Sequence, residues 1–195
     1  MAIEAGREAV SLGVDYGQRH RIELEYALAQ CREHGIERRV LRIEWDKPVR
    51  DIPLGRSLEE IRKGVSPAFL PGRNAVFLTL ACAEAAGVGA EEVWIGVNAV
   101  DFSGYPDCRP EFISAFQAMI GQAIPGGPNI LAPLIQMSKP QIALEARRLG
   151  LEPGATWSCY RPRFIPEGIT PCGECDACVL HDHAWNEVKK MDMEK

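Results

Sequence analysis

The sequence lacks an apolar segment long enough to cross a membrane. Its longest, nearly unbroken apolar run covers residues 75–83 and is ended by Glu84, well short of the ~20 residues that a membrane-spanning helix requires. The first eight residues include two acids and no apolar stretch of the kind that a secretory signal contains. Both absences favour a cytoplasmic protein with no membrane partner.

An excess of basic residues is also missing. The chain has 22 Lys and Arg against 27 Asp and Glu, a formal charge of −5. A broad phosphate-binding surface for duplex nucleic acid is therefore not expected, and a small-molecule substrate is. There is no internal repeat, and 195 residues suit one domain of about 150 residues with a smaller appendage. We place the domain at 1–153 and the appendage at 154–195.

Strand-like and helix-like periodicities alternate along the first 150 residues. Such alternation predicts an α/β fold with a parallel, doubly wound sheet covered by helices on both faces. Residues 44–71 show little periodicity and predict a long loop, a frequent place for active-site lids. We expect strands at 9–15, 39–43, 92–97 and 129–134, and helices at 19–34, 74–86, 110–121, 139–149 and 179–190.

The seven cysteines are an odd number, which argues against a fully paired disulfide framework. Cys172, Cys175 and Cys178 are each separated by two residues, and Cys159 lies upstream. Four thiolates converging on one ion at about 2.3 Å make a closed, structural zinc site. An iron–sulfur cluster accepts similar spacings, and thiols without metal are a third reading. His181 and His183 are alternative ligands that we expect to be solvated instead, and we assign Cys31 and Cys82 to the core.

Three polar loops follow predicted strands, at 15–20, at 69–74 and at 98–109. In open α/β sheets, ligands bind beyond the carboxyl ends of the strands. The third loop combines acids, an arginine, an amide and two aromatic rings. That mixture is able to recognise a planar heterocycle by stacking and by hydrogen bonds to its edge.

Five segments together resemble the 7-cyano-7-deazaguanine synthase family of queuosine precursor synthesis. They are DYGQRH (15–20), FLPGRN (69–74), GVNAVDFSGYPDCRPEF (96–112), TWSCY (156–160) and PCGECDAC (171–178). The resemblance follows the family's order over almost the whole chain, and the SGYPDCR block is specific.

The resemblance implies an adenine nucleotide α-hydrolase-like (PP-loop, Rossmann-like) fold with a structural zinc on the four named cysteines. It also implies an ATP-dependent ligase that converts 7-carboxy-7-deazaguanine and ammonia to the nitrile, with magnesium accompanying ATP. The acid would be activated as an acyl adenylate, converted to an amide by ammonia, and activated again for dehydration. A homodimer is a further family-level expectation, and no catalytic residue is assigned.

The same resemblance suggests which residues touch the substrates. We expect Asp101 and Asp107 to accept hydrogen bonds from the guanine-like edge, because carboxylates read base donors in this way. Phe102 and Tyr105 would stack on its face. Each of these residues also has a purely structural alternative. The acids would cap a turn of the loop, and the aromatic rings would cover the edge of the sheet.

Anionic groups of the substrates require basic and polar partners. We expect Arg73, Asn74 and Arg109 to contact carboxylate or phosphate, with ion pairs that fix the loop as the alternative. The expected nucleotide-binding residues come from the first loop, where a solvated basic face is the alternative reading. They are Asp15, Tyr16, Gln18, Arg19 and His20.

One family feature is absent from the sequence, namely the strand and Ser-Gly-Gly-x-Asp-Ser loop that hold pyrophosphate. Residues 3–6 resemble the end of the helix that follows that loop. In the family's strand order, 3-2-1-4-5, the missing strand 1 lies at the centre of the sheet. Without it, the strands at 9–15 and 92–97 would each have an unpaired edge, or they would have to pair with each other. Buried unpaired groups cost about 1 to 3 kcal/mol each, so we expect a marginal chain that binds ATP poorly. An N-terminally incomplete sequence and a genuinely shortened homologue are the two explanations.

Two other functions stay open at this point. The first is a catalytically inactive homologue that binds a deazapurine or serves as a scaffold. The second is another adenylating amidase or thiolase on the same fold, because site details and not the fold decide the chemistry. Cys108 is the cysteine to test as a sulfur carrier.

Overall fold

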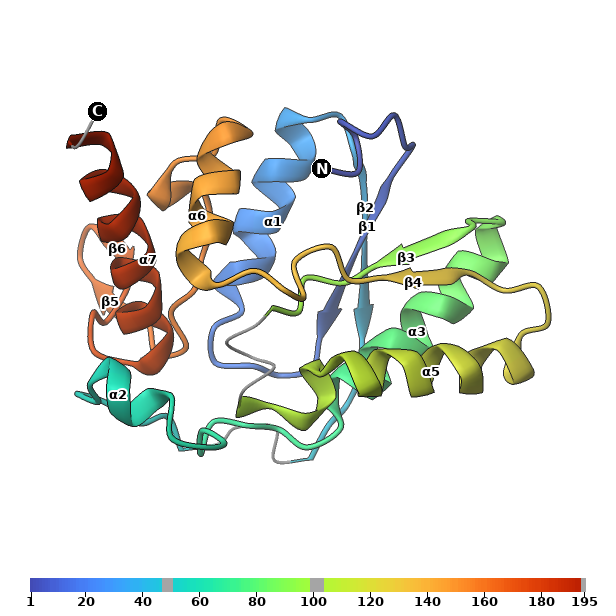
Figure 1. Ribbon diagram of the computed structural model, residues 1–195, viewed down its shortest axis with the longest axis horizontal. Helices are drawn as coiled ribbons and strands as arrows, with labels where there is room; N and C mark the ends of the chain where they lie inside the picture. Colours follow the sequence, from blue (N-terminus) through green and yellow to red (C-terminus); the bar gives the residue numbers. More distant parts are fainter. Residues whose placement is uncertain (47–50, 99–103, 194–195) are drawn as a thin grey trace.

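The computed structural model of the chain describes residues 1–46, 51–98 and 104–193. Strands alternate with helices through the first 150 residues, and a hairpin and a long helix complete the chain (Figure 1). No helix in this described part is long and apolar enough to span a membrane. The elements in chain order are β1 (Val10–Asp15), α1 (Ile22–Glu33), β2 (Glu37–Arg42), α2 (Leu58–Ile61), α3 (Arg73–Val88), β3 (Glu92–Trp94), η1 (Pro106–Cys108), α5 (Pro110–Ala123), β4 (Asn129–Leu131), α6 (Lys139–Arg148), η2 (Pro153–Ala155), β5 (Arg163–Ile165), β6 (Gly168–Thr170) and α7 (Asp176–Met193).

The first β-α-β unit joins two parallel strands through α1. Val10 of β1 lies opposite Glu37 of β2, and Asp15 lies opposite Arg42. Burial increases along β1 from its exposed start to its last three residues. The strand therefore delivers the residues that follow it, beginning with Tyr16, into the interior at its carboxyl end.

The second unit holds the main hydrophobic core. Strands β3 and β4 are parallel, and α3 and α5 pack beside them (Figure 1). Their apolar side chains form one buried cluster, and their burial stabilises this half of the molecule by the hydrophobic effect. The cluster consists of Leu78, Cys82, Ala85, Val93, Phe116, Ile120 and Ile130.

The expected parallel pairing is confirmed, but the continuous doubly wound sheet is not found among the described residues. β1 pairs with β2 and β3 pairs with β4, as two separate two-stranded sheets. The strand expected at 92–97 covers only Glu92–Trp94. It does not pair with β1, and the two strands belong to different sheets. The two strands that we expected to have unpaired edges are therefore not hydrogen-bonded to each other.

Several element boundaries differ from the sequence expectation. Helix α3 passes through Gly87 and ends at Gly89, whose φ of +71° closes the helix in the left-handed region. Helix α7 begins at Asp176, three residues earlier than expected. The expected loop at 44–71 contains α2, which Ser57 and Glu60 cap reciprocally. The capping box at Ser138 and Gln141 is confirmed at the start of α6.

The C-terminal region combines the antiparallel β5–β6 hairpin with α7. Ala143 of α6 and Ala184 and Val188 of α7 are buried together, with Trp185 packed against them. This contact joins the two parts that we separated at residue 153. The domain division itself stays a prediction.

Residues 1–7 form a helical turn with a defined end. Arg7 N–H donates to the Ala2 carbonyl at 3.1 Å and Gly6 N–H donates to the Ile3 carbonyl at 2.9 Å, with φ of +73° at Gly6. These bonds make a Schellman motif, the helix-end geometry that residues 3–6 predict. Arg7 also pairs with Glu92 at the start of β3 at 2.9 Å.

Candidate functional site

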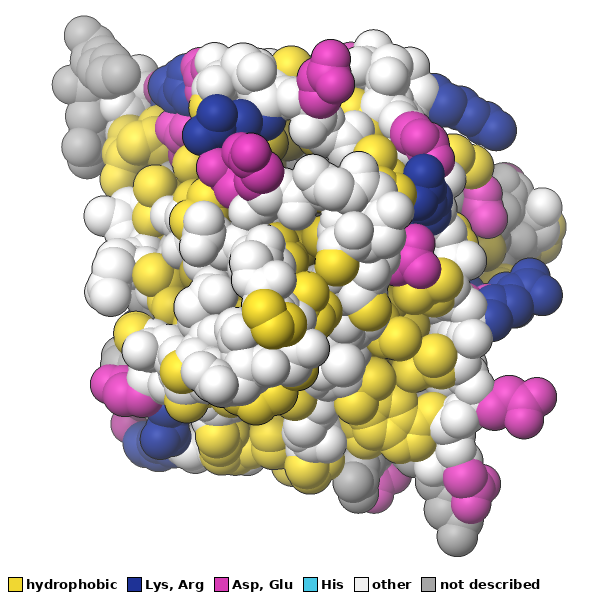
Figure 2. Space-filling model, turned by 90° about the vertical axis from the view of Figure 1, so that its right-hand side faces the viewer, with side chains coloured by type: hydrophobic (Ala, Val, Ile, Leu, Met, Phe, Trp, Pro, Cys, Tyr) yellow, Lys and Arg dark blue, Asp and Glu magenta, His cyan; other side chains and the backbone are white. Residues whose placement is uncertain are grey.

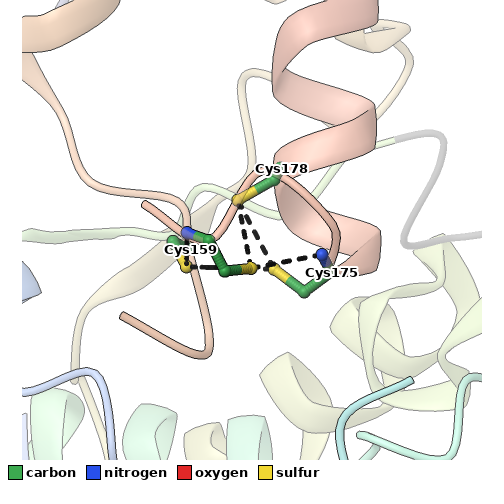
Figure 3. Close-up of side chains that lie close together, drawn as sticks. Cys159, Cys175 and Cys178 are labelled. Carbon is green, nitrogen blue, oxygen red and sulfur yellow. Dashed lines mark hydrogen bonds between the residues drawn. The ribbon is translucent and has the colours of Figure 1, made fainter. Parts of the chain in front are cut away.

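Four cysteines form a compact buried cluster in the C-terminal region (Figure 3). The distances between their sulfur atoms are 3.6 Å for Cys159 and Cys172, 3.6 Å for Cys175 and Cys178, 3.9 Å for Cys172 and Cys178, and 4.0 Å for Cys159 and Cys175. A disulfide needs about 2.05 Å. A tetrahedron with bonds of about 2.3 Å needs about 3.8 Å between ligand sulfurs. The cluster therefore has the dimensions of a four-thiolate metal site.

Backbone N–H groups point at the sulfurs of this cluster. The N–H groups of Arg161 and Cys172 donate to Cys159 Sγ at 3.3 Å each. Those of Glu174 and Cys175 donate to Cys172 Sγ at 3.4 and 3.3 Å. Burial raises the pKa of the Cys172 thiol, but these two bonds and those from the Cys159 and Cys175 side chains outweigh it, and the pKa falls to about 7. Burial keeps the pKa values of Cys159 and Cys178 above their ordinary value. Among these cysteines the surroundings therefore favour the thiolate, the form that binds metal, at Cys172.

Two cavities meet beyond the carboxyl end of β1. The larger has a volume of about 650 Å³, within the usual range for small-molecule sites, and the smaller has a volume of about 50 Å³, below that range. Apolar side chains from α6, α7 and the segments beside them form much of its lining, including Ile142, Trp157 and Leu180. Both cavities are lined by the same five residues, which we call the shared wall: Tyr16, His20, Arg73, Tyr105 and Tyr160.

Arg73 is the cation of the shared wall. Its guanidinium lies over the Phe77 ring, 5.7 Å from the centroid, and its buried Nε has no hydrogen-bond partner among the described residues. Burial lowers the pKa of Arg73, but Tyr16, Tyr160 and Asp107 raise it further and leave it above its ordinary value. A charged guanidinium with an unused donor at a cavity wall is suited to bind an anionic ligand.

His20 lies beside it on the same wall. Its Nε2 is 3.4 Å from a Glu23 oxygen, its ring packs 5.1 Å from that of Tyr160, and its buried Nδ1 has no partner among the described residues. Burial lowers the pKa of His20 below its ordinary value of 6.5, with Glu23 opposing this and Arg73 adding to it. The imidazole is therefore neutral near pH 7, when one ring nitrogen is able to accept a proton.

A sequence model described as "Queuosine biosynthesis protein QueC" matches residues 1–189 of the chain. The chain belongs to the QueC family. It is 54% identical over 184 residues to "7-cyano-7-deazaguanine synthase 2" of Rhodopseudomonas palustris (strain HaA2), covering 94% of this chain and 88% of that protein. Similar proteins named "7-cyano-7-deazaguanine synthase" come from Synechococcus sp. (strain CC9605), 38% identical over 99% of this chain and 88% of theirs, and from Myxococcus xanthus (strain DK1622), 40% identical over 96% and 86%.

Several residues expected from the resemblance to this family line the cavities. Arg73 and Tyr105 belong to the shared wall, and Asp107 lines the smaller cavity beside them. The Tyr105 ring stacks on Phe69, with centroids 5.2 Å apart and planes 21° from parallel. Asp101 and Phe102 lie outside the described residues.

Two other residues that we expected to contact the substrate, Asn74 and Arg109, line neither cavity. Asn74 is buried and bonded within the protein: its N–H donates to Asp107 Oδ2, and its Nδ2 donates to the Asp107 carbonyl and to Cys108 Sγ, each at 3.1 Å. Arg109 is exposed at the start of α5 and lines neither cavity. Asn74 thus holds the loop by hydrogen bonds and not by an ion pair, and its contact with the substrate stays a prediction. Cys108 is 2% exposed, unsuited to carry sulfur to a substrate.

The residues that we expected to bind the nucleotide divide in a similar way. Tyr16 and His20 are in the shared wall, and Arg19 and Gln18 line the smaller cavity. Gln18 is 3% exposed, and its amide bonds the backbone of Tyr16 and Val14 and the Glu23 carboxylate. Asp15 is buried and pairs with Arg21 at 2.7 Å and Arg42 at 3.6 Å.

Two aromatic residues that line the smaller cavity were not among the site residues expected from the sequence. Phe69 opens the FLPGRN segment and Tyr160 closes TWSCY, so each stood in a segment already singled out. Their contribution depends on rings from distant segments packing together, Phe69 with Tyr105 and Tyr160 with His20. Periodicity along the chain carries no signal of such pairs.

Proposed function

We propose that the chain converts 7-carboxy-7-deazaguanine and ammonia to 7-cyano-7-deazaguanine at the expense of ATP. The match to the QueC family over residues 1–189 carries the proposal. The shared wall supports it, because a reaction that joins two substrates needs two binding spaces that meet. A substrate carboxylate oxygen attacks the α-phosphorus, pyrophosphate leaves, and ammonia displaces AMP to give the amide. The amide oxygen then attacks the α-phosphorus of a second ATP and pyrophosphate leaves. AMP departs with that oxygen, and the nitrogen loses its two protons as the nitrile forms.

We assign the ring edge of the deazapurine acid to the smaller cavity. The volume of this cavity, about 50 Å³, is too small for the whole bicyclic molecule, so the rest of the ligand would lie along the shared wall. Asp107 in the smaller cavity offers a carboxylate to N–H donors, and Phe69 and Tyr105 offer aromatic surface. Arg73 would hold the carboxylate at the shared wall, with Arg19 at the rim. The nucleotide would occupy the larger cavity, with its phosphates toward Tyr16 and His20. In such a site catalysis consists mainly of positioning and charge stabilisation.

The four cysteines are suited to bind zinc, because their sulfur atoms are spaced as in a tetrahedral site and backbone N–H groups donate to two of them. Cys159, Cys172, Cys175 and Cys178 leave no open coordination position, so the ion would be structural. Metal analysis of aerobically and anaerobically purified protein distinguishes this from an iron–sulfur cluster. One zinc per chain and no absorbance near 400 nm is the expected result, and a brown chromophore would contradict it.

Turnover is the direct test of the function. Metal-loaded chain is incubated with the acid, ATP, magnesium and ammonium, and the nitrile and AMP are followed by mass spectrometry. Nitrile that requires all components supports the proposal. Binding of the acid without turnover would favour the inactive deazapurine-binding homologue instead.

The expectation that a strand and phosphate loop precede residue 1 stays a prediction. Translation of the DNA upstream of the Met1 codon tests it, and a stop codon there would contradict it. ATP binding by the 195-residue chain, measured beside any longer reading frame, gives its functional consequence.

A homodimer and a cytoplasmic location also stay predictions. Figure 2 shows hydrophobic side chains gathered on the side of the molecule where α3 and α5 lie, and both helices have exposed apolar residues, Val76, Val88 and Met119. This surface supports self-association. Analytical ultracentrifugation of the wild type and of Met119→Glu tests it, with a shift to monomer expected in the variant.

A further inference from the structure

We propose that Asp176 is a positioning residue that couples the four-cysteine metal site to the wall of the smaller cavity. Through its carboxylate, metal binding and binding of the deazapurine acid would strengthen each other. The proposal rests on the proposed function for the identity of that ligand. The structural part of the proposal, namely that residues 51–70 are attached to the metal site, is independent of the proposed function.

The backbone before α2 lies directly against the cysteine cluster. Leu54 forms an antiparallel bridge with Cys175, and Gly55 N–H donates to the Glu174 carbonyl at 2.9 Å. Ile52 packs on the cysteines and also lines the smaller cavity. The start of the segment from residue 51 to residue 70, which we call the strap, is therefore fixed to the metal site.

Asp176 fixes the strap at two further points, and both it and Ser66 also line the larger cavity. The Asp176 Oδ1 is buried and has no hydrogen-bond partner among the described residues. Asp176 lies between two of the cysteines in sequence and is 5% exposed. Its Oδ2 accepts from Arg56 Nη1 at 2.9 Å and from Ser66 Oγ at 3.0 Å. These donors lie on either side of α2, so one carboxylate oxygen holds both ends of the helix-bearing stretch. Hydrogen bonds to an ionised acceptor are stronger than neutral ones.

Ser66 passes this attachment to the cavity wall. Ser66 Oγ accepts from Ala68 N–H at 3.3 Å, and the Ser66 carbonyl accepts from Phe69 N–H at 2.9 Å. Ala68 and Phe69 line the smaller cavity, where Phe69 stacks on Tyr105. An unbroken series of hydrogen bonds thus connects the metal loop with the aromatic surface offered to the deazapurine.

A coupling of this kind is reciprocal by thermodynamic necessity. If the metal orders the loop around Asp176, and Asp176 orders the strap, the metal-bound state presents a formed cavity. A ligand in that cavity then favours the ordered strap and, through it, the metal-bound state. Without the metal, the cavity wall has to be ordered at the moment of binding, which weakens the apparent affinity.

The decisive variant is Asp176→Asn, which keeps the side chain's size and removes its charge. We expect it to retain one metal per chain while its Kd for the deazapurine acid rises about tenfold. KM for the acid should follow Kd. Because Asp176 also lines the larger cavity, kcat is measured with both the acid and ATP saturating, where it should change less than about threefold. Asp182→Asn, an exposed position on the same helix, is the matched control and should leave all of these within about twofold.

A readout independent of activity follows from Arg62 and Lys63, two exposed trypsin sites within the strap. Cleavage after them should be about tenfold faster in Asp176→Asn and in chelator-treated wild type, and Asp182→Asn should match the untreated parent. If Asp176→Asn does not fold, Ser66→Ala removes a donor outside the metal loop and should give the same pattern with smaller changes.

Unchanged cleavage and unchanged acid affinity in metal-loaded Asp176→Asn would overturn the proposal. A fall in kcat with no change in Kd would do so as well. If the parent neither binds nor converts the acid, the proposed function fails, and the cleavage rates alone then decide the attachment of the strap.

Discussion

The four-cysteine metal site and the shared wall lie near each other, but one is built from a short stretch of sequence and the other from distant segments. All four cysteines fall between residues 159 and 178, and the backbone donors to their sulfurs come from the same stretch. The shared wall collects single residues from segments as far apart as Tyr16 and Tyr160. The first site depends on local spacing, and the second depends on the whole fold.

This difference separates two kinds of sensitivity. A residue of the cluster contributes to stability, because a closed site binds its ion only in the folded chain and metal affinity becomes folding free energy. A residue such as Arg73 lines a cavity with an unsatisfied donor, an arrangement that serves a ligand and contributes little to folding. Substitutions in the two regions should therefore separate stability from activity.

The largest effect is expected from Cys175→Ala. Cys175 is completely buried, and without it three ligands remain and the closed tetrahedron is lost. We expect loss of the bound metal and of about 5 kcal/mol or more of stability, which lowers Tm by about 10 to 20 °C in a chain of this length. Metal analysis and thermal unfolding measure both.

Cys82→Ala is the matched control for this prediction. Cys82 is equally buried but belongs to the α3–α5 core, so its truncation should cost about 1 kcal/mol and leave the metal in place. A Cys175→Ala protein with full metal content would contradict the assignment of the cluster.

The next largest effect concerns activity. Arg73→Gln should lower kcat/KM by a factor of about 10² to 10³, the usual consequence of removing one charge-stabilising donor. Its Tm should change little, because the cost of burying the charge offsets much of what the contacts of Arg73 contribute to stability. Steady-state kinetics and thermal unfolding, measured on the same preparation, test whether activity falls while stability is kept.

Arg109→Gln supplies the comparison for Arg73. Arg109 is exposed and lines neither cavity, so kcat/KM should change less than about threefold. Equal losses in the two variants would show that charge near the site, and not the position of Arg73, is what matters.

A smaller effect on both properties is expected for Asn74→Ala. Asn74 makes three hydrogen bonds with Asp107 and Cys108, and its Oδ1 accepts a fourth from Arg73 Nη2 at 3.4 Å. Three of the four involve the side chain that the substitution removes. Leaving their buried partners unsatisfied costs about 1 to 3 kcal/mol, and the displaced Asp107 should raise KM for the acid. Denaturant unfolding and KM measure the two consequences.

Gln117→Ala tests whether that change in KM is specific. The Gln117 side chain makes two bonds, to the Pro128 carbonyl and from the Ile130 N–H, but it lines neither cavity. A similar loss of stability with an unchanged KM is the expected result. A raised KM in this variant would mean that general destabilisation accounts for the Asn74 result.

Much of the fold is predictable from the sequence because the relevant interactions are local. The capping box at Ser138 and the alternation of strands with helices act within a few residues, and the structure has them where expected. Gly87 misled because a glycine inside a helix lowers stability without ending it; the left-handed turn occurs at Gly89. The short α2 escaped prediction because its cap at Ser57 stands in a stretch without apolar periodicity.

The candidate site is predictable only in part, for a related reason. The sequence places Arg73 and Asn74 next to each other in one loop and gives both a polar character. Whether a side chain faces the cavity or the interior is decided by the start of α3, which turns Asn74 toward Asp107 and leaves Arg73 in the shared wall. Likewise, the role of Asp176 depends on a strap more than 100 residues away in sequence.

The smallest expected effect concerns the pH dependence of stability. Burial lowers the pKa of His20 below 6.5, so below pH 6.5 the unfolded chain binds a proton that the folded chain resists. The free energy of unfolding therefore falls as the pH is lowered through this range. In His20→Asn this part of the slope should disappear, whereas His34→Asn, at an exposed position, should retain it. Urea unfolding at intervals from pH 7.5 to pH 5 measures the slope, and identical slopes in the parent and His20→Asn would mean that His20 is solvated in the folded protein, with no buried imidazole at the shared wall.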